Sequence, residues 1–319
     1  MPPLTTGSMA EHLKPGLMAI VGTEFDGREA MYSRLYNVKT TRRNFEEVLG
    51  ATGLPIAVMK PQGVDIQRFD PREGSKLRLD PETFALGCEY TEEAWDDDLY
   101  GGDGSMLRAS LRDLVEGIAE RVELEAHIPF TVAGFTTAQF SGTGTVKVLP
   151  GATSAADDAF FSDTHQPISG AQGIAQSNIV VADFNTTSYN DALVKFRRLR
   201  DDQGKRIGAM IRPEVLVGPP EMELAFREVV QSGSRVDQLN PGVTNVNKGA
   251  TSILIDAYLD DVDSWFIRGS RHYLWFLWRW RPRQDTFDDR SARVMVHVIY
   301  CRFVARPVHY FGWLGSLGV

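Results

Sequence analysis

A serine, a histidine and an aspartate lie close together in one segment, and these are the side chains of a hydrolase triad. Asp163 and His165 are two residues apart, and serines flank them at positions 162 and 169. The chain has no Gly-x-Ser-x-Gly turn and no His-Glu-x-x-His motif, which are local signatures of many hydrolases. A hydrolase centred on Asp163/His165 is therefore the less favoured alternative.

A run of acidic residues, Asp96–Asp98 followed by Asp103, has the side chains of a calcium or magnesium site. A calcium loop of the EF-hand type needs ligands at alternate positions, glycine at the sixth and glutamate at the twelfth. The acids here are consecutive, so their side chains diverge, and the twelfth position from Asp96 is Leu107. We predict no metal site. The run instead precedes a helix, whose amino end is stabilised by negative charge.

Cofactor motifs are absent from the sequence. Gly142 and Gly144 lack the third glycine and the acidic partner of a dinucleotide site, and no Walker A sequence is present. Cys88 and Cys301 are too few for a disulfide framework or a four-cysteine metal site, and both suit small buried positions. We predict no cofactor and no enzymatic activity.

Arginine and tryptophan are interleaved near the carboxyl end, an arrangement that could stack single-stranded bases. The residues are Arg271, Arg279, Arg281 and Arg283, with Trp275, Trp278 and Trp280. Four consecutive large apolar residues, 274–277, favour a buried strand instead. The net charge of -8 also argues against strong nucleic-acid binding, because phosphate neutralisation needs cations.

Hydrophobic periodicity predicts the elements that position these residues. Apolar residues at every second position from Phe84 to Tyr90 predict a strand. Three- and four-residue apolar spacing over 105–128 predicts a long amphipathic helix, with Ser105 as its N-cap and Pro129 as its end. Further helices are predicted at 185–200 and 219–231, and strands at 213–218, 253–258, 264–267, 272–281 and 293–303.

Residues 56–90 predict a long two-stranded hairpin. Val64 and Ile66 alternate with polar residues on one strand, and Leu77 and Leu79 do so on the other. A turn cluster, Pro71–Ser75, separates the two strands. An isolated hairpin of this length is marginally stable in water, so it must lie either on its own sheet or on another subunit.

Length and composition indicate a globular chain. Its 319 residues, 43% apolar and 24% charged, can bury a full core. No apolar run approaches the ~20 residues that span a bilayer. The amino-terminal residues also lack the basic and apolar regions of a signal peptide. We expect the protein to stay in a bacterial cytoplasm without membrane contact.

Three segments carry a resemblance to one family. MYSRLYNVKTTRRNFEE (31–47) resembles its N-terminal arm, FFSDTH (160–165) resembles a segment before a Gly/Ser-rich loop, and LVGPPEME (216–223) resembles its Pro-Pro helix. Together with the hairpin, the acidic run at Asp96–Asp98 and the long helix, these segments are similar to the major capsid (major head) proteins of Mu-like tailed bacteriophages. The resemblance covers about residues 25–313.

This resemblance implies an α+β chain with the Hong-Kong-97-type phage capsid fold. Its parts would be an N-terminal arm at 1–50, an extended β-hairpin loop at 51–90, the first part of a peripheral domain with a long spine helix at 91–132, an axial domain at 133–270, and peripheral return strands with the C-terminus at 271–319.

The resemblance also implies a structural protein that self-assembles into the icosahedral head of a tailed phage around double-stranded DNA. Its partners would be other copies of itself as hexamers and pentamers, a portal, separate scaffold or cement proteins, and packaged DNA in non-specific contact. The protein would be located in the virion capsid after assembly in the host cytoplasm. An encapsulin-like bacterial nanocompartment shell is the nearer alternative, against which the long hairpin and the arm argue.

We expect inter-subunit contacts on the hairpin and on the long helix. The apolar hairpin residues have no obvious cover within the chain, and the hairpin cations would pair with an outward acidic strip on a neighbour's helix. The residues are Val64, Ile66, Arg68, Arg72, Lys76, Leu77, Arg78 and Leu79 on the hairpin, and Glu116, Glu120 and Glu123 on the helix.

Overall fold

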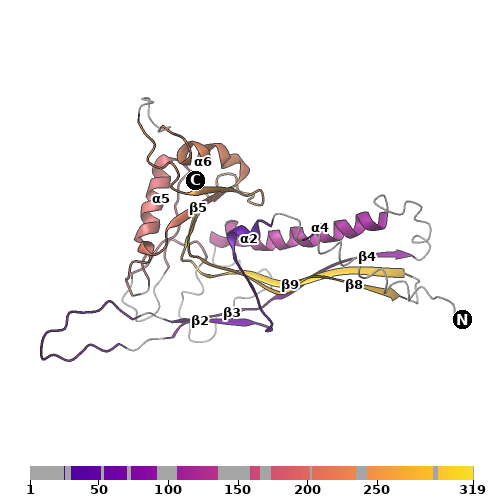
Figure 1. Cartoon of the computed structure of the whole chain (residues 1–319), viewed down its shortest axis with the longest axis horizontal. Helices are drawn as coiled ribbons and strands as arrows, with labels where there is room; N and C mark the ends of the chain where they lie inside the picture. Colours follow the sequence, from indigo (N-terminus) through magenta and orange to yellow (C-terminus); the bar gives the residue numbers. More distant parts are fainter. Residues whose placement is uncertain are drawn as a thin grey trace. The chain divides into compact units, whose positions relative to one another are not determined.

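The computed structural model describes residues 25, 30–51, 54–69, 73–91, 106–135, 159–165, 174–201, 203–234, 243–289 and 294–318. The chain forms two compact units (Figure 1). The first comprises Met1–Asn44, Asp80–Ala126 and Phe276–Ala305, and the second comprises Phe45–Leu79, His127–Trp275 and Arg306–Val319. Among the helices that the structure describes, none combines the length and the apolar composition needed to cross a bilayer.

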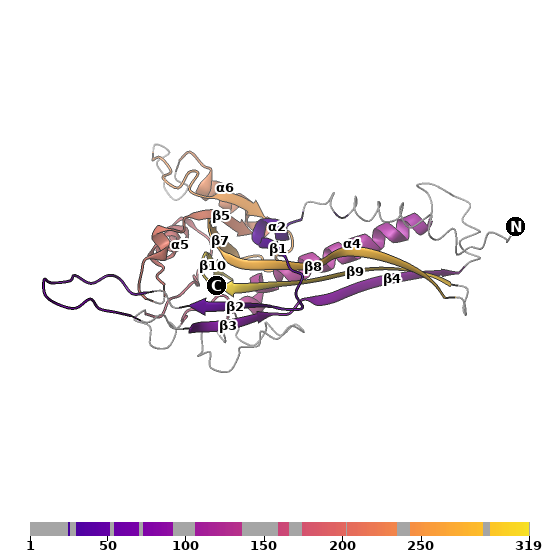
Figure 2. The ribbon, with the colours of Figure 1, turned by 60° about the horizontal axis from the view of Figure 1, so that its bottom comes forward.

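The first unit is built on a four-stranded sheet in the order β1-β8-β9-β4 (Figure 2). Its strands are β1 (Asn37–Thr40), β4 (Glu82–Thr91), β8 (Tyr273–Asp289) and β9 (Val294–His309). β4 pairs antiparallel with β9, from Glu82 opposite Phe303 to Thr91 opposite Val294. The strand predicted from Phe84 to Tyr90 is confirmed, and the two strands predicted near the carboxyl end are longer than expected.

The helix α4 (Met106–His127) lies along this sheet (Figure 1). The apolar stripe predicted for it is at most 5% exposed at Leu111, Leu114, Val115, Ile118 and Val122. At Gly117, a Cβ would lie 2.8 Å from Cδ2 of Leu86, so the missing side chain allows β4 to approach closely. The helix ends one residue before the short helix η1 (Ile128–Phe130), as Pro129 predicts.

The second unit contains a four-stranded sheet in the order β10-β7-β5-β6. Its strands are β5 (Pro213–Gly218), β6 (Ser252–Ile255), β7 (Trp265–Gly269) and β10 (Trp313–Ser316). β5 pairs parallel with β6 and antiparallel with β7, which also pairs antiparallel with β10.

The strand β10 belongs to this second unit, because it pairs with β7 and buries Trp313 and Leu314 completely. The resemblance implied that residues 271–319 together form the peripheral return strands and the C-terminus. The apolar pattern of a four-residue strand is too short to predict which strand it pairs with. The partner is set by contacts between segments far apart in the sequence.

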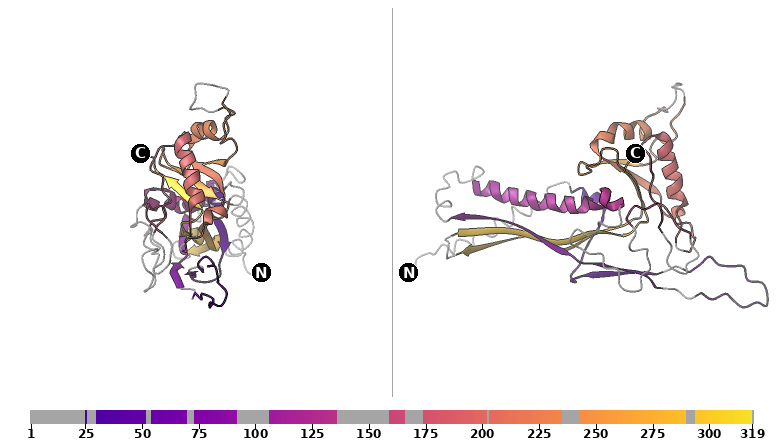
Figure 3. Two further views of the ribbon diagram at one scale, coloured as in Figure 1. Left: turned by 90° about the vertical axis from the view of Figure 1, so that its left-hand side faces the viewer. Right: turned by 180° about the vertical axis from the view of Figure 1, so that it is seen from behind.

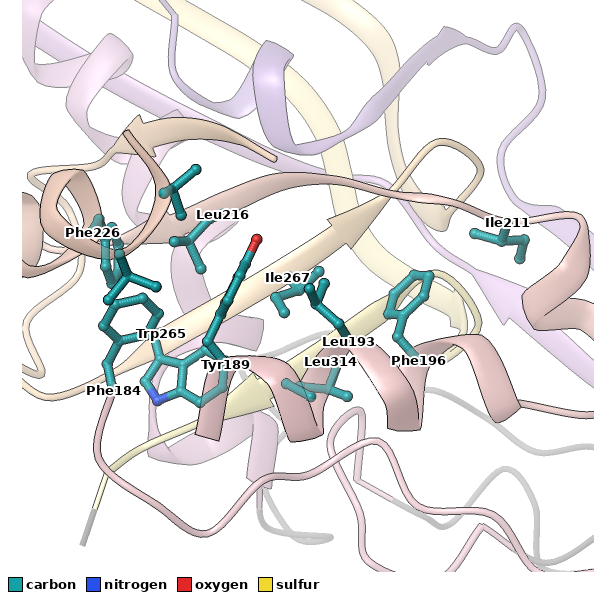
Figure 4. Close-up of a cluster of buried hydrophobic side chains, with 13 residues drawn as sticks. Phe184, Tyr189, Leu193, Phe196, Ile211, Leu216, Phe226, Trp265, Ile267 and Leu314 are labelled. Carbon is teal, nitrogen blue, oxygen red and sulfur yellow. The ribbon is translucent and has the colours of Figure 1, made fainter. Parts of the chain in front are cut away.

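Helices α5 (Thr186–Arg198) and α6 (Glu223–Val230) pack on the second sheet around an aromatic core (Figure 4). Phe184 stacks edge-on against Phe226 at 4.6 Å and Trp265 at 5.4 Å between ring centroids. At Gly218, a Cβ would lie 2.4 Å from the Phe226 ring, so only glycine allows this ring to lie on β5. Side chains from both helices and three strands therefore form one core.

The ends of α5 and α6 match the sequence patterns. The Asn185 side chain accepts from the Thr187 and Ser188 amides, and Ser188 Oγ accepts from the Asn185 amide, which makes a capping box. The Pro-Pro segment begins with the short helix η4 (Pro220–Met222), which continues into α6. The remaining short helices are η2 (Val132–Phe135) and η3 (Ile207–Ala209).

The hairpin differs from its prediction. Its strands are β2 (Glu46–Ala51) and β3 (Glu73–Leu79), which pair antiparallel with Glu46 opposite Leu79. The predicted turn at Pro71–Ser75 overlaps the start of β3, and Val64 and Ile66 lie outside any strand. Turn-forming composition shows where a chain can bend, but the paired segment was set by register with residues 46–51.

Candidate functional site

A run of exposed apolar side chains lies on the loop between β2 and β3, residues 54–69, which we call the excursion. The exposed fractions are 52% at Leu54, 61% at Ile56, 66% at Val58, 86% at Met59, 54% at Val64, 67% at Ile66 and 40% at Phe69. The excursion extends away from β2 and β3 (Figures 1 and 3). Contiguous apolar exposure of this kind marks an interaction surface, because water contact with apolar groups is unfavourable.

The backbone of the excursion has one turn and otherwise irregular, extended character. The Val64 N–H donates to the Pro61 carbonyl at 3.4 Å, and Gly63 has a φ of +81°, in the left-handed region that glycine favours. No helix or strand occurs between residues 54 and 69. The excursion therefore has no backbone ladder of its own that would fix the positions of these apolar side chains.

The base of the hairpin uses its residues internally. Leu79 is 1% exposed and Leu77 is half-buried, so the expectation that both lack cover within the chain is wrong. The Arg78 guanidinium lies 3.9 Å from the centroid of the Phe45 ring on the facing segment. Arg78 therefore stabilises its own hairpin.

The acidic strip on α4 is divided by the fold. Glu116 and Glu120 are exposed, as predicted. Glu123 is 7% exposed, and its carboxylate accepts hydrogen bonds from the backbone amides of Met31 and Tyr32, so its predicted outward position is wrong. Helical spacing correctly placed the three glutamates on one side of α4, but it could not show that the arm covers the end of that side at Glu123.

Of the hairpin cations, Arg68 is exposed on the excursion. Arg72 and the side chain of Lys76 lie outside the described residues, as do Asp96–Asp98, Asp103 and Ser105. Within the part of the chain that the structure describes, no group of three or more His, Cys, Asp or Glu side chains could hold a metal ion.

The proposed triad segment has another arrangement. His165 Nε2 lies 2.8 Å from the Asn178 side-chain oxygen, and its ring stacks on Tyr310 at 3.7 Å. Asp163 is exposed and accepts a bond from the Thr164 hydroxyl. His165 Nε2 thus bonds an amide oxygen and not a serine hydroxyl, and Ser169 lies outside the described residues.

Asn178 is a residue that the sequence analysis missed. Its side chain is fully buried and makes four hydrogen bonds: Nδ2 donates to the Phe160 and Trp313 carbonyls, and Oδ1 accepts from the Ser162 amide and bonds His165. A lone asparagine in a polar segment carries no periodic signal. Its role arises from three chain segments that meet only in the folded unit.

A second missed pair is His127 and Asp256, with His127 Nε2 2.7 Å from Asp256 Oδ2. The side chains are 2% and 0% exposed, and Asp256 also accepts from the Tyr258 amide. A buried carboxylate needs such partners, because an unpaired one is costly. This pair joins the end of α4 to the loop after β6 within the second unit.

The arginine–tryptophan segment is divided between core and surface. Trp278 is 1% exposed, and Leu274, Phe276 and Leu277 are buried, which confirms the predicted core. Trp280 is half-buried, with the guanidinium carbons of three arginines 5.6–5.9 Å from its ring centroid. These are Arg279, Arg283 and Arg302. Arg279 and Arg302 also donate to the Arg42 and Pro81 carbonyls, so they stabilise neighbouring chain segments.

A family model that matches this chain and a solved structure similar to it both describe phage capsid proteins. The family model described as "Phage capsid protein" matches residues 74–275, more than half of the chain. No curated protein matches the sequence.

Three of the solved structures with a similar fold are a GTA particle capsid, a phage chain and a bacteriophage capsid. The capsid of an empty GTA particle is 12% identical with a TM-score of 0.57, and covers 91% of this chain and 90% of its own. A Microbacterium phage Oxtober96 chain is 8% identical with a TM-score of 0.54, covering 91% and 87%. The mature capsid of bacteriophage PhiM1 is 11% identical with a TM-score of 0.54, covering 88% and 84%.

Proposed function

This chain belongs to the phage capsid protein family, and from that premise we propose how its copies build a shell. The protein is a structural major capsid subunit of a tailed phage with the Hong-Kong-97-type fold, not an enzyme, and it associates with itself into capsid oligomers. A closer relationship to the Mu-like subunits stays a prediction.

We propose that the excursion binds a neighbouring copy of the same chain. The observation that carries this proposal is the apolar exposure of the excursion, which reaches 86% at Met59. Covering one such side chain stabilises a complex by ~1.5–3 kcal/mol. In a closed shell every subunit both gives and receives this contact, so a modest energy per contact is repeated many times.

The parts of the fold have distinct roles in this proposal. The first unit, with α4 as the spine helix and the long strands, corresponds to the peripheral domain, and the second unit corresponds to the axial domain. The segment before β2 would be the arm, and the segment from β2 to β3 would be the extended loop. The rigid helix and sheets keep their shape, while the excursion adapts to non-equivalent neighbours.

The proposed assembly consists of hexamers and pentamers in an icosahedral head formed in the host cytoplasm. A portal, a separate scaffold or cement protein, and packaged double-stranded DNA would be the further partners. The net charge of -8 implies that contact with DNA is weak and non-specific. The family of the chain supports the proposal of these partners, and its charge supports weak contact with DNA.

We expect the purified protein to form particles of uniform, shell-like size. Light scattering and negative-stain electron microscopy measure this directly. Nuclease-protected double-stranded DNA inside particles isolated from producing cells would identify a phage head, whereas a packaged enzyme would identify an encapsulin-like compartment. A protein that remains monomeric at all concentrations, with or without its head-assembly partners, would contradict the proposal.

We further propose that Arg68 pairs with Glu116 or Glu120 of a neighbour, since all three side chains are exposed. Arg68→Glu should raise the concentration needed for assembly, most strongly at low salt, because salt screens both attraction and repulsion. One exposed pair contributes ~0–1 kcal/mol, repeated over the shell. Light scattering against salt concentration measures the effect.

The matched control reverses the charge on the partner. Arg68→Glu combined with Glu116→Arg or Glu120→Arg should recover assembly if that glutamate is the partner. If Arg68→Glu assembles like the wild type at every salt concentration, this pairing does not exist.

A further inference from the structure

Glu123 connects two segments that are far apart in the sequence. Its Oε1 accepts from the Met31 N–H and its Oε2 from the Tyr32 N–H, each at 2.9 Å, across 92 and 91 residues. The residue is 7% exposed. Both carboxylate oxygens of a buried side chain are therefore bonded to the amino end of helix α2 (Tyr32–Leu35) in the arm.

The helix α2 has no cap of its own. Met31 occupies the N-cap position and makes no side-chain hydrogen bond to the first turn. A helix of one turn is unstable by itself, because nucleation costs more than its few hydrogen bonds return. A carboxylate supplies both the missing acceptor and the negative charge that the amino end of a helix favours. Glu123 thus acts as the cap of α2 from a distant helix.

Two other contacts of the arm lie beside this cap. The Tyr36 hydroxyl donates to the Ala126 carbonyl at 2.5 Å, within one turn of Glu123 on α4. The ring of Tyr32 packs on Phe276 with 4.5 Å between centroids. Tyr32, Leu35 and Tyr36 are all buried in the first unit. Residues 32–36 of the arm therefore pack against α4 and β8 of their own subunit.

We propose that Glu123 is a latch that docks residues 31–36 of the arm on their own subunit before that subunit joins a shell. Only the role of the latch in assembly rests on the proposed function, since the contact itself is intramolecular. Without the carboxylate, two amide groups lose a buried acceptor and α2 loses its cap. The β4–β9 ladder and the apolar stripe of α4 do not include these bonds, so they remain folded.

The test is hydrogen exchange on the full chain at a concentration below assembly, with the variant Glu123→Gln. Glutamine has one acceptor atom where glutamate has two, so its NH₂ group would face one of the two backbone donors. Loss of charge-assisted bonds should accelerate exchange of the amides of residues 31–36 about 10- to 100-fold. Trypsin should also cleave after Arg34 sooner, while exchange in β4 and α4 keeps its wild-type rate.

Glu125→Gln is the matched control, because it makes the same chemical change on the same helix. The Glu125 carboxylate pairs with Arg121 inside α4. This variant should exchange at residues 31–36 as the wild type does. Glu123→Asp keeps the charge on a shorter side chain and should give an intermediate rate, which also decides the question if the glutamine variant does not fold.

Unchanged exchange at residues 31–36 in Glu123→Gln, or wild-type exchange in Glu123→Asp when the glutamine variant is unfolded, would overturn the latch. Loss of protection throughout the first unit would also overturn it, because Glu123 would then be part of the common core. A failed latch leaves particle formation by the wild type unaffected. Failure of the proposed function would instead appear as the absence of wild-type particles.

Discussion

Replacing residues 52–72 by an Asn-Gly turn should leave a folded subunit that forms no shells. Ala51 and Glu73 are opposite each other at the end of the β2–β3 ladder, so a two-residue turn can join them without disturbing the paired residues. The replaced segment contains the whole excursion and its exposed apolar side chains. Each neighbour-to-neighbour contact would lose its hydrophobic part, and closure of a shell depends on all of them.

Light scattering should show monomers or small oligomers for this variant, and circular dichroism and thermal unfolding should match the wild type. The point variants Ile56→Asp and Ile66→Asp should act in the same direction, because they place charge in the contact. Their matched controls, Ile56→Leu and Ile66→Leu, keep the apolar surface and should assemble. Normal shells from the Asn-Gly variant would show that the excursion is not the contact that builds the shell.

Asn178→Leu should lower the free energy of unfolding of the second unit by about 3–5 kcal/mol, because each buried polar group left without a partner costs ~1–3 kcal/mol. Leucine has the same branched arrangement of four side-chain heavy atoms but bonds none of the four partners of this side chain. The Ser162 amide, His165 and the Phe160 and Trp313 carbonyls would stay buried with fewer partners. The segments at residues 160–165, at 178 and at 313 would no longer be held together by hydrogen bonds to this side chain.

Calorimetry should show the melting temperature of this variant lowered by about 10 °C, since 1 kcal/mol corresponds to a few degrees in a unit of this size. Asn190→Leu is the control, because Asn190 is exposed on α5. It should melt within 1–2 °C of the wild type, as surface substitutions usually do (about ±0.5 kcal/mol). A melting temperature for Asn178→Leu equal to that of the control would mean that this network contributes nothing to stability.

Local patterns predicted most of the regular elements. The stripe from Leu111 to Val122 and Pro129 predicted α4 and its end. Asn185 predicted the start of α5, and the apolar run before Pro219 and Pro220 predicted β5, η4 and α6. Each of these signals is complete within a few turns or residues of the chain, because helix period, capping and proline geometry act over short distances.

Pairing across the chain was predicted less well. The partner of β3 is the segment at Glu46–Ala51, while the sequence suggested residues near Val64 and Ile66. Those two residues alternate like a strand but belong to the excursion. Strand patterns describe which face is apolar, and many segments share the same pattern, so the partner is chosen only when register, turn and burial are satisfied together.

The sequence by itself determined the long helix and the principal strands, because these depend on periodicity and capping, while the class of the fold came from the resemblance to a family. Only the tertiary structure decided that Glu123 caps α2, that Asn178 joins three segments and that Trp280 lies among arginines. A buried polar side chain is stable only with its partners around it. Those partners come from residues about 90 or more positions away in the case of Glu123, a distance at which local sequence carries no information about contact.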